Sequence, residues 1–311
     1  MERGKLVEGV LSTLAGAIAW GTSGTCVQYL LTHSTIDSLL LTSLRQTGAG
    51  IMFLSVLLLR DRPQLHAMAA DRDTRRRLLV FGTAGLFLNS VLYAATISYT
   101  NAGTATVLQS LNVPMVLALA CALERRLPRR LEVGALVCAA LATFLIATGG
   151  NPGTLHLPLP GLLLGIATAA ASVFYTTYPK PLFERWGSFA TTGVGMAAAG
   201  VCGLMLWGVT QGAQVGFPAL GLDCWLVLGA AALVGTFGAY GLFLHGVSVV
   251  GPVRGNMLGA AEPVSATVLT ALTLHTAFSW ADWVGLALMV ATIALVTRQA
   301  AETQPQETAS G

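Results

Sequence analysis

The sequence predicts an all-α polytopic membrane protein, and two observations carry that prediction. Only 10% of the 311 residues are charged and 54% are hydrophobic, whereas an average globular chain has roughly 25% charged residues. Charges this sparse cannot cover the surface of a water-soluble protein. The hydrophobic residues form runs of about 17 to 24, and a helix needs about 20 to cross a membrane. Barrel strands are excluded, because they would be about ten residues long with alternating polarity.

Ten transmembrane helices are expected, each about one bilayer long. Two boundaries fall inside nearly continuous apolar sequence and depend on turn chemistry. Asn101 with Gly103 divides the third helix from the fourth, and Gly251 with Pro252 divides the eighth from the ninth. Glycine favours turns and proline favours the first turn of a helix. The expected helices are 9–31, 36–59, 77–99, 101–123, 131–149, 159–179, 188–208, 222–245, 251–274 and 280–298.

The basic residues set the expected orientation. Cytoplasmic loops carry the excess of lysine and arginine, and under the ten-helix assignment every basic residue except Arg45 lies on one side. These residues are Arg3, Lys5, Arg60, Arg62, Arg72, Arg75, Arg76, Arg77, Arg125, Arg126, Arg129, Arg130, Lys180, Arg185, Arg254 and Arg298. A wrong helix count would scatter them over both sides. Both termini are therefore expected in the cytoplasm, with the polar segment 299–311 as a disordered tail.

The chain repeats itself at an offset of 149 residues, which becomes 151 near Gly134 and Gly285, and this pairs the helices of the first half with those of the second. The aligned pairs include Gly16 with Gly165, Ser23 with Ser172, Tyr29 with Tyr178, Thr42 with Thr191, Leu79 with Leu228, and Pro114 with Pro263. Because five is odd, the second set of five helices crosses the membrane in the opposite direction. We expect two inverted five-helix repeats, 1–150 and 151–298, an architecture typical of transporters. A static scaffold that arose by duplication is the alternative.

Four segments carry a resemblance to a known family. They are AIAWGTS at 17–23, SLRQTGAG at 43–50, NAGTATVLQSLNVPMVLAL at 101–119 and GPVRGNMLGAAEPVSATVL at 251–269. Together they resemble the EamA-like ten-helix transporters of the drug/metabolite transporter superfamily. The resemblance implies a secondary carrier of the bacterial inner membrane, commonly an exporter of amino acids or related metabolites, with a central cavity. The chain departs from the family at Asn112, where glutamate often precedes the proline, and at His275, where many members have glutamate.

Two ionisable residues fall well inside expected helices. Glu262 lies near the middle of 251–274 and Arg45 lies inside 36–59. A charge at membrane depth costs at least about 2.5 kcal/mol, so such residues are candidates for function. Glu262 is predicted to bind a proton or a substrate amine, or else to fix a kink by hydrogen bonding. Arg45 is predicted to hold an anion or to pair with Glu262, although such an arginine can also join helices or extend toward the interface.

Two prolines and several neutral polar residues lie at similar depth. Pro114 and Pro263 remove a backbone hydrogen bond at matching places in the two halves, and broken helices of this kind mark transporter binding sites. They are predicted hinges, with simple packing kinks as the alternative. Four amide side chains are predicted to bind substrate, or alternatively to join helices. These are Asn89, Gln109, Asn112 and Asn256.

Four aromatic residues lie within the helices instead of at their ends, where interfacial aromatics collect. They are Trp20, Tyr93, Tyr175 and Tyr240. Aromatic faces at this depth could form a stacking or cation-binding wall of a substrate cavity. Ordinary packing is the alternative for each of them.

Several classes of protein are disfavoured. The five cysteines are an odd number and mostly intrahelical, so no disulfide framework is expected. No metal cluster, nucleotide-binding loop or catalytic motif occurs, so we expect no metal, no cofactor, no catalytic residues and no enzyme activity. The arginines at 72–77 adjoin a membrane helix and indicate topology and lipid headgroups, not nucleic acid.

The predicted function is secondary active transport of small organic metabolites by alternating access around a midplane cavity. Export of amino acids or related compounds is preferred, with the proton as a possible coupling ion. A multidrug or organic-cation exporter is the first alternative, and a membrane-embedded enzyme of lipid metabolism is the second. The expected partners are a small-molecule substrate and membrane lipid, and the protein is expected to be a monomer or a homodimer.

Overall fold

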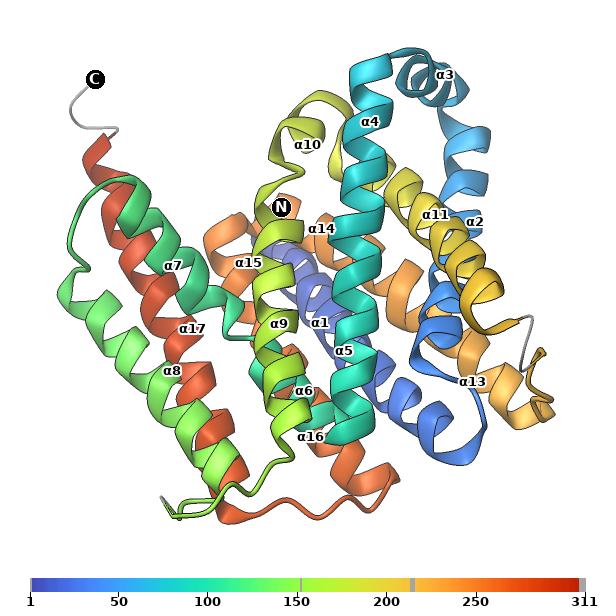
Figure 1. The fold of residues 1–311 in the computed structure, drawn as a ribbon. Helices are drawn as coiled ribbons and strands as arrows, with labels where there is room; N and C mark the ends of the chain where they lie inside the picture. The colour runs from blue at the N-terminus through green and yellow to red at the C-terminus, as the bar shows by residue number, and fades with distance from the viewer. Residues whose placement is uncertain (1, 152, 213–215, 308–311) are drawn as a thin grey trace.

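The computed structural model describes residues 2–151, 153–212 and 216–307, and every regular element in these ranges is a helix (Figure 1). Its α-helices are α1 (Glu2–His33), α2 (Ser38–Arg60), α3 (Arg62–Ala70), α4 (Arg72–Val80), α5 (Leu88–Tyr99), α6 (Ala102–Gln109), α7 (Asn112–Leu123), α8 (Arg130–Thr148), α9 (Leu159–Thr177), α10 (Lys180–Trp186), α11 (Ser188–Trp207), α13 (Leu222–Ala232), α14 (Ala239–Val250), α15 (Pro252–Gly259), α16 (Ala261–Thr273) and α17 (Trp280–Glu307). Three π-helical segments lie among them: η1 (Phe81–Phe87), η2 (Gly208–Gly212) and η3 (Leu233–Gly238).

Nine helical segments in the described part of the chain are long and apolar enough to span a membrane. They are Lys5–His33, Ser38–Arg60, Arg72–Tyr99, Ala102–Leu123, Arg130–Thr148, Leu159–Trp186, Ser188–Gln211, Leu222–Val250 and Trp280–Gln299. The remaining expected helix, 251–274, is divided into α15 and α16, and its apolar stretch Met257–Thr273 is shorter than a full span. The predicted class, an all-helical membrane protein, is thereby confirmed.

Two of the expected helices are broken at corresponding places. One break separates α6 from α7 at Leu111, and the other separates α15 from α16 at Ala260. Each break carries a tighter turn, in which Leu111 N donates to Leu108 O at 3.1 Å and Ala260 N donates to Met257 O at 3.2 Å. A proline follows three residues later in both cases, and its missing N–H removes a bond that a continuous helix would make.

Several boundaries differ from those expected. The helix expected at 77–99 begins at Arg72, because Asp71 caps α4 by accepting from Asp73 N. The short helix α3 was not expected, and Asp61 caps it by accepting from Gln64 N. The last helix continues to Glu307, past the expected end at 298 and into the segment expected to be disordered, of which residues 308–311 lie outside the described ranges.

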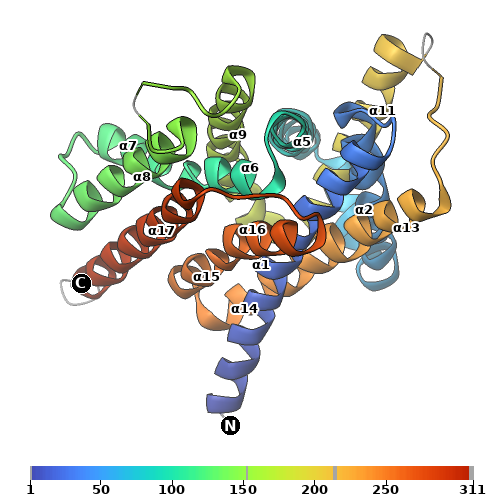
Figure 2. The same ribbon diagram turned by 90° about the horizontal axis from the view of Figure 1, so that it is seen from below.

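The two ends of the bundle differ in composition. We call the end that carries α3 and α10 the arginine-rich end; it is at the top of Figure 1. There Asp71 pairs with Arg185 at 2.6 Å, which links α4 to α10, and Arg126 pairs with Glu132 at 2.7 Å, which links α7 to α8. The opposite end carries the turns between α5 and α6 and between α16 and α17. Figure 2 views the bundle from that end, with α1 surrounded by other helices and α8 paired with α17 at one side.

Candidate functional site

A cavity of about 90 Å³ lies in the interior of the bundle, between α1, α2, α5, α6, α9, α14 and α16. Eight of the ten side chains predicted to bind substrate line it. They are Trp20, Arg45, Asn89, Tyr93, Gln109, Tyr175, Tyr240 and Glu262. The chain therefore brings together, from both halves of the sequence, most of the polar and aromatic residues that stand out at membrane depth.

The other two predicted residues lie elsewhere. Asn112 is partly buried but is not among the side chains that line the cavity. It follows the break at Leu111, where the helix axis changes direction, so its depth in the sequence did not determine which way it faces. Asn256 belongs to α15, and its side chain lies outside the described part of the chain.

Arg45 is a buried cation without a carboxylate partner in the described residues. Its side chain is only 8% exposed, and Nη1 donates to Ser23 Oγ at 3.0 Å. Its Nε is buried and has no hydrogen-bond partner. A buried charge normally requires pairing and full hydrogen bonding. Arg45 therefore presents an unused donor in the wall of the cavity, where an anionic group could accept from it.

Gln46 is a cavity residue that the sequence analysis missed. Its Nε2 donates to Leu86 O and to Ser90 Oγ, both at 3.0 Å, and these bonds fix α2 against the η1–α5 segment. Its Oε1 is buried and unpaired, like Nε of Arg45 beside it. A neutral glutamine gives no charge signal, although its place next to Arg45 in the middle of a helix could have identified it. The pair offers one donor and one acceptor to a ligand.

Glu262 lines the same cavity as Arg45. It lies two residues after the break at Ala260, and its side chain is partly buried. Among the described residues no ion pair joins Glu262 to Arg45, so the structure does not support the prediction that Arg45 pairs directly with Glu262. The cavity thus contains one positive and one negative group that are not neutralised by each other, together with Tyr93 and Tyr240.

Aromatic side chains form another part of the wall. The rings of Trp20 and Tyr240 meet edge to face with centroids 4.9 Å apart, which fixes α1 against α14. The Tyr93 hydroxyl is 2.7 Å from Thr106 Oγ1 and lies against Gly24, where no larger residue would fit. Asn89 Oδ1 accepts from Ser172 Oγ at 2.7 Å, so this side chain also joins α5 to α9. These contacts hold the wall in one arrangement.

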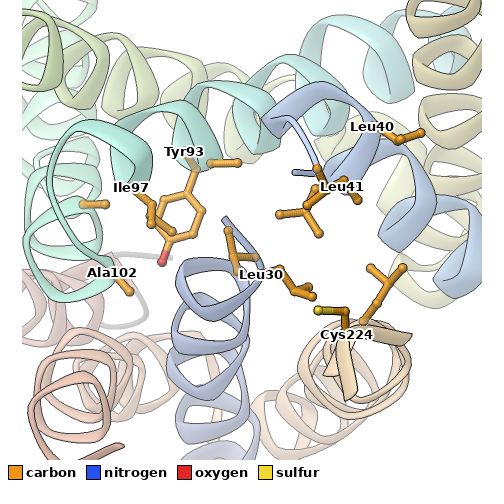
Figure 3. Packing of buried hydrophobic residues seen from close by; sticks show 12 residues of the cluster. Leu30, Leu40, Leu41, Tyr93, Ile97, Ala102 and Cys224 are labelled. Carbon is orange, nitrogen blue, oxygen red and sulfur yellow. The ribbon is translucent and has the colours of Figure 1, made fainter. Parts of the chain in front are cut away.

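A buried hydrophobic cluster lies at the opposite end of the bundle, beside a groove of about 490 Å³ between α1 and the end of α16. Leu30, Leu40, Leu41, Ile97 and Cys224 belong to a buried cluster that fills the space between α1, α2, α5 and α13 (Figure 3). Polar contacts add to this packing around Gln28, in α1. Its Oε1 accepts from Ala102 N at 2.7 Å, and its Nε2 donates to Thr276 Oγ1 at 3.1 Å. One side chain therefore ties α1 to the start of α6 and to the turn before α17.

The arginine-rich end lacks the matching contacts. At the opposite end α6 packs against both α1 and α16, and α1 packs against α5. The corresponding elements of the other half are α15 with α9 and α7, and α9 with α14. In the ranges that the structure describes, none of these three pairs is packed closely together. The helices around the cavity are therefore packed differently at its two ends, with closer packing of these pairs at the opposite end.

A membrane bundle that encloses a polar cavity with unsatisfied charged groups has the arrangement of a solute transporter. Comparison with known proteins gives the particular family. Residues 7–148 and 159–298 each match the EamA-like transporter family, and the chain belongs to that family. The resemblance inferred from the four segments is thereby confirmed. Because the family is one of transporters, the chain is a transporter and not an enzyme, which rules out the lipid-metabolism alternative.

Individual relatives agree with this assignment. The chain is 30% identical over 294 residues to the "Uncharacterized inner membrane transporter YicL" of Salmonella typhimurium, covering 94% of this chain and 96% of the relative. It is 24% identical over 282 residues to the "Uncharacterized transporter YwfM" of Bacillus subtilis, covering 90% of each. A solved crystal structure covers 94% of this chain and 98% of its own with a TM-score of 0.64 at 20% identity, which supports the fold.

Proposed function

We propose that the protein is a secondary active transporter that exports small zwitterionic metabolites, amino acids or related compounds, by alternating access. The observation that carries the proposal is the presence of two opposite charges in one cavity without a direct ion pair between them. Arg45 Nε is buried without a partner, and Glu262 lines the same cavity. A molecule with both a carboxylate and an amine would bind both charges at once.

An inverted repeat of two five-helix halves supports this mechanism. The repeat matches α1 with α9 and α14 with α5, and both the α1–α14 pair and the α9–α5 pair are extensively packed. It also matches α2 with α11 and α8 with α17, and the two members of each of these matched pairs pack against each other. The π-helical segments η1 and η3 overlap at the 149-residue offset, and so do the breaks at Leu111 and Ala260. These correspondences favour ten membrane-crossing segments, with α15 and α16 together as the ninth.

Unequal packing at the two ends supports alternating access. In a symmetric carrier the contacts that close one end can be remade at the other by exchanging the roles of the halves. At the opposite end α6 packs on α1 and α16, whereas at the arginine-rich end α15 is not packed closely on α9 or α7 in the described residues. With the arginine-rich end in the cytoplasm, as its basic residues favour, this is an inward-facing state. The cavity of about 90 Å³ must widen to admit a metabolite, because ligand sites usually measure about 300–1,000 Å³.

The residues divide into roles under this proposal. Arg45 binds the carboxylate end of the substrate, and Gln46 Oε1 accepts from a donor group of the substrate. Glu262 binds its amine, or a proton when the site is empty, which couples export to a proton gradient. Trp20, Tyr93, Tyr175 and Tyr240 form the wall, and Asn89 and Gln109 complete the polar lining. Pro114 and Pro263 act as the hinges of the two broken helices. The name of the Salmonella relative favours the inner membrane as the location.

An exporter of organic cations is the second candidate, and one observation favours it. Four aromatic side chains and Glu262 share the cavity, and aromatic faces with a carboxylate suit a lipophilic cation. Arg45 separates the two candidates, because a buried guanidinium repels a cation unless an anion accompanies it. A zwitterion uses both charges, whereas a cation uses one and must tolerate the other.

Counterflow in proteoliposomes tests the proposal. The purified protein is loaded in turn with unlabelled amino acids, nucleobases and organic cations, and entry of the labelled compounds is measured. We expect exchange of amino acids by the native protein and its loss in Glu262→Gln and in Arg45→Gln. Asn112→Leu is the matched control, since Asn112 lies outside the cavity lining. Exchange of cations alone would favour the second candidate, and exchange of no class would contradict both.

A further inference from the structure

A second cavity lies at the arginine-rich end and shares no lining residue with the central cavity. Its volume is about 230 Å³, and α3, α4 and α11 form its walls. The lining is almost entirely apolar, with Leu65, Met68, Leu78, Leu79 and Val194 among its residues. Leu79 is 56% exposed, so the cavity is a groove on the outer surface of the bundle. None of the central-site residues contributes to it.

A single charged residue, Arg75, joins this apolar lining. Arg72 lies one helical turn before Arg75 and therefore on the same side of α4. Both side chains are exposed, and neither has an ion-pair partner in the part of the chain that the structure describes. Two guanidinium groups therefore lie beside the apolar lining of the groove.

The nearby carboxylates are already engaged, so they do not neutralise these arginines. Asp71 pairs with Arg185 at 2.6 Å and accepts from the Thr74 hydroxyl at 2.9 Å. Asp73 pairs with Arg77 at 2.8 Å, on the other side of α4. The corner between α3 and α4 consequently keeps a local excess of positive charge, which an anion from outside the chain would have to balance.

The depth of the groove identifies what kind of anion can reach it. The span Ser38–Arg60 ends, and the span Arg72–Tyr99 begins, at this corner. The apolar part of the groove therefore lies at the edge of the hydrocarbon core, and Arg72 and Arg75 lie at the level of the lipid headgroups. A water-soluble anion would not contact the apolar lining, and a hydrocarbon would not pair with the arginines. Only an amphipathic anion can bind both parts of the groove.

We propose that this groove binds one anionic phospholipid, with part of an acyl chain along Leu65, Leu79 and Val194 and the phosphate on Arg72 and Arg75. The lipid contacts α3, α4 and α11, and so adds a contact between the first half of the chain and the second at the arginine-rich end. Lys and Arg side chains at a membrane surface attract anionic lipid about fivefold each, so two of them distinguish an anionic from a zwitterionic headgroup.

Lipid titration of the purified full-length protein in detergent tests this proposal. Dioleoylphosphatidylglycerol and dioleoylphosphatidylcholine have the same chains and differ in headgroup charge. Bound lipid is counted by native mass spectrometry, and stabilisation is measured as the shift of the thermal midpoint. We expect phosphatidylglycerol to bind at least tenfold more tightly than phosphatidylcholine. Arg75→Gln should weaken the binding of phosphatidylglycerol about fivefold, and the double variant Arg72→Gln/Arg75→Gln should weaken it about 25-fold.

Two further variants make the result specific. Arg130→Gln removes an exposed arginine elsewhere at the same end and should leave binding unchanged. Ala69→Phe fills the groove from α3 and should weaken both lipids while every arginine remains. Equal binding of the two lipids, an equal effect of Arg130→Gln and Arg75→Gln, or full competition by glycerol phosphate would each overturn the proposal. A variant whose lipid-free thermal midpoint matches the native protein is folded, so its lipid affinity is a fair comparison.

Discussion

Leu111 and Ala260 have nearly the same backbone conformation, although they lie 149 residues apart in the chain. Their dihedral angles are φ −58°, ψ −15° and φ −60°, ψ −12°. Each residue ends a short tight turn, and each stands three residues before a proline. The break in the α6–α7 pair and the break in the α15–α16 pair are therefore the same local structure formed twice. Both breaks adjoin the central cavity, since Gln109 precedes one and Glu262 follows the other.

Replacing the two prolines by alanine should slow transport without unfolding the protein. Alanine restores the missing N–H and favours a continuous helix. If straightening raises the barrier between the two states by about 1.4 kcal/mol, counterflow in Pro114→Ala/Pro263→Ala falls about tenfold. The thermal midpoint should stay the same or rise. Pro160→Ala is the control, because Pro160 is in the first turn of α9, where a helix loses no bond. Native exchange rates in the double variant would contradict the hinge role.

Arg45 should decide whether a substrate needs a carboxylate. Hydrogen bonds to charged groups contribute about 1.5–3 kcal/mol, so Arg45→Gln should lower the affinity for an amino acid by about ten- to 150-fold. The affinity for the corresponding amine, which lacks the carboxylate, should change little. Arg45→Lys should recover only part of the difference, because an ammonium group lacks the planar fork of donors. Competition against labelled counterflow measures each ligand. Unchanged discrimination between acid and amine in Arg45→Gln would contradict the assignment of the carboxylate to Arg45.

Gln28 should stabilise the closed form of the opposite end. Gln28→Leu leaves Ala102 N without its side-chain acceptor, and an unmet buried donor costs about 1–3 kcal/mol. We expect faster amide hydrogen exchange in the first turn of α6 and a shift of the population toward opening at that end. Gln64→Leu is the control, since Gln64 donates to Trp186 O at the arginine-rich end. Equal changes in exchange at both ends would indicate general loosening and contradict a local closing role.

Asp71 should make stability at the arginine-rich end depend on acid pH. The Thr74 hydroxyl, the backbone N–H groups of Asp73 and Thr74, and the Arg185 guanidinium hold the pKa of this carboxyl below its usual value. The unfolded chain therefore takes up the proton more readily. The stabilisation is complete above about pH 4 and is lost as the pH falls through the lowered folded value.

Thermal midpoints between pH 2 and pH 7 check this prediction. The native protein should lose more stability below about pH 4 than Asp71→Asn, in which the titrating group is absent. Asp61→Asn is a suitable control, because Asp61 caps α3 at the same end and asparagine caps a helix about as well. Parallel pH curves for the native protein and Asp71→Asn would show that Asp71 contributes no such dependence.

The sequence predicted the fold well where membrane chemistry leaves few options. Runs of apolar residues must be helical in lipid because every backbone group needs an internal partner. Pro114 and Pro263 located both helix breaks to within a few residues. The short helices α3 and α10 were missed, because they lie outside the apolar runs and depend on contacts such as that of Asp71 with Arg185.

The sequence predicted which residues lie at the depth of the cavity better than it predicted which of them line it. Residues such as Arg45 and Glu262 stand out because charge is rare inside a membrane, and they do line the cavity. Asn112 has the right depth but does not line the cavity, and it lies just after the break at Leu111, which the sequence located only to within a few residues. Gln46 was overlooked because only the three-dimensional structure shows that its Oε1 has no partner.

The π-helical segments η1 and η3 make the cavity depend on a backbone hydrogen-bonding pattern that composition does not reveal. A π-helical bulge contains one residue more than the α-helical path it replaces. If Phe81–Phe87 became regular α-helix with no residue removed, everything after it would turn by about 100°. Asn89 and Tyr93 would then leave the cavity, with no change in their own identity. The same change in Leu233–Gly238 would turn Tyr240 away, so the backbone path of these two helices specifies the cavity as firmly as the residues themselves.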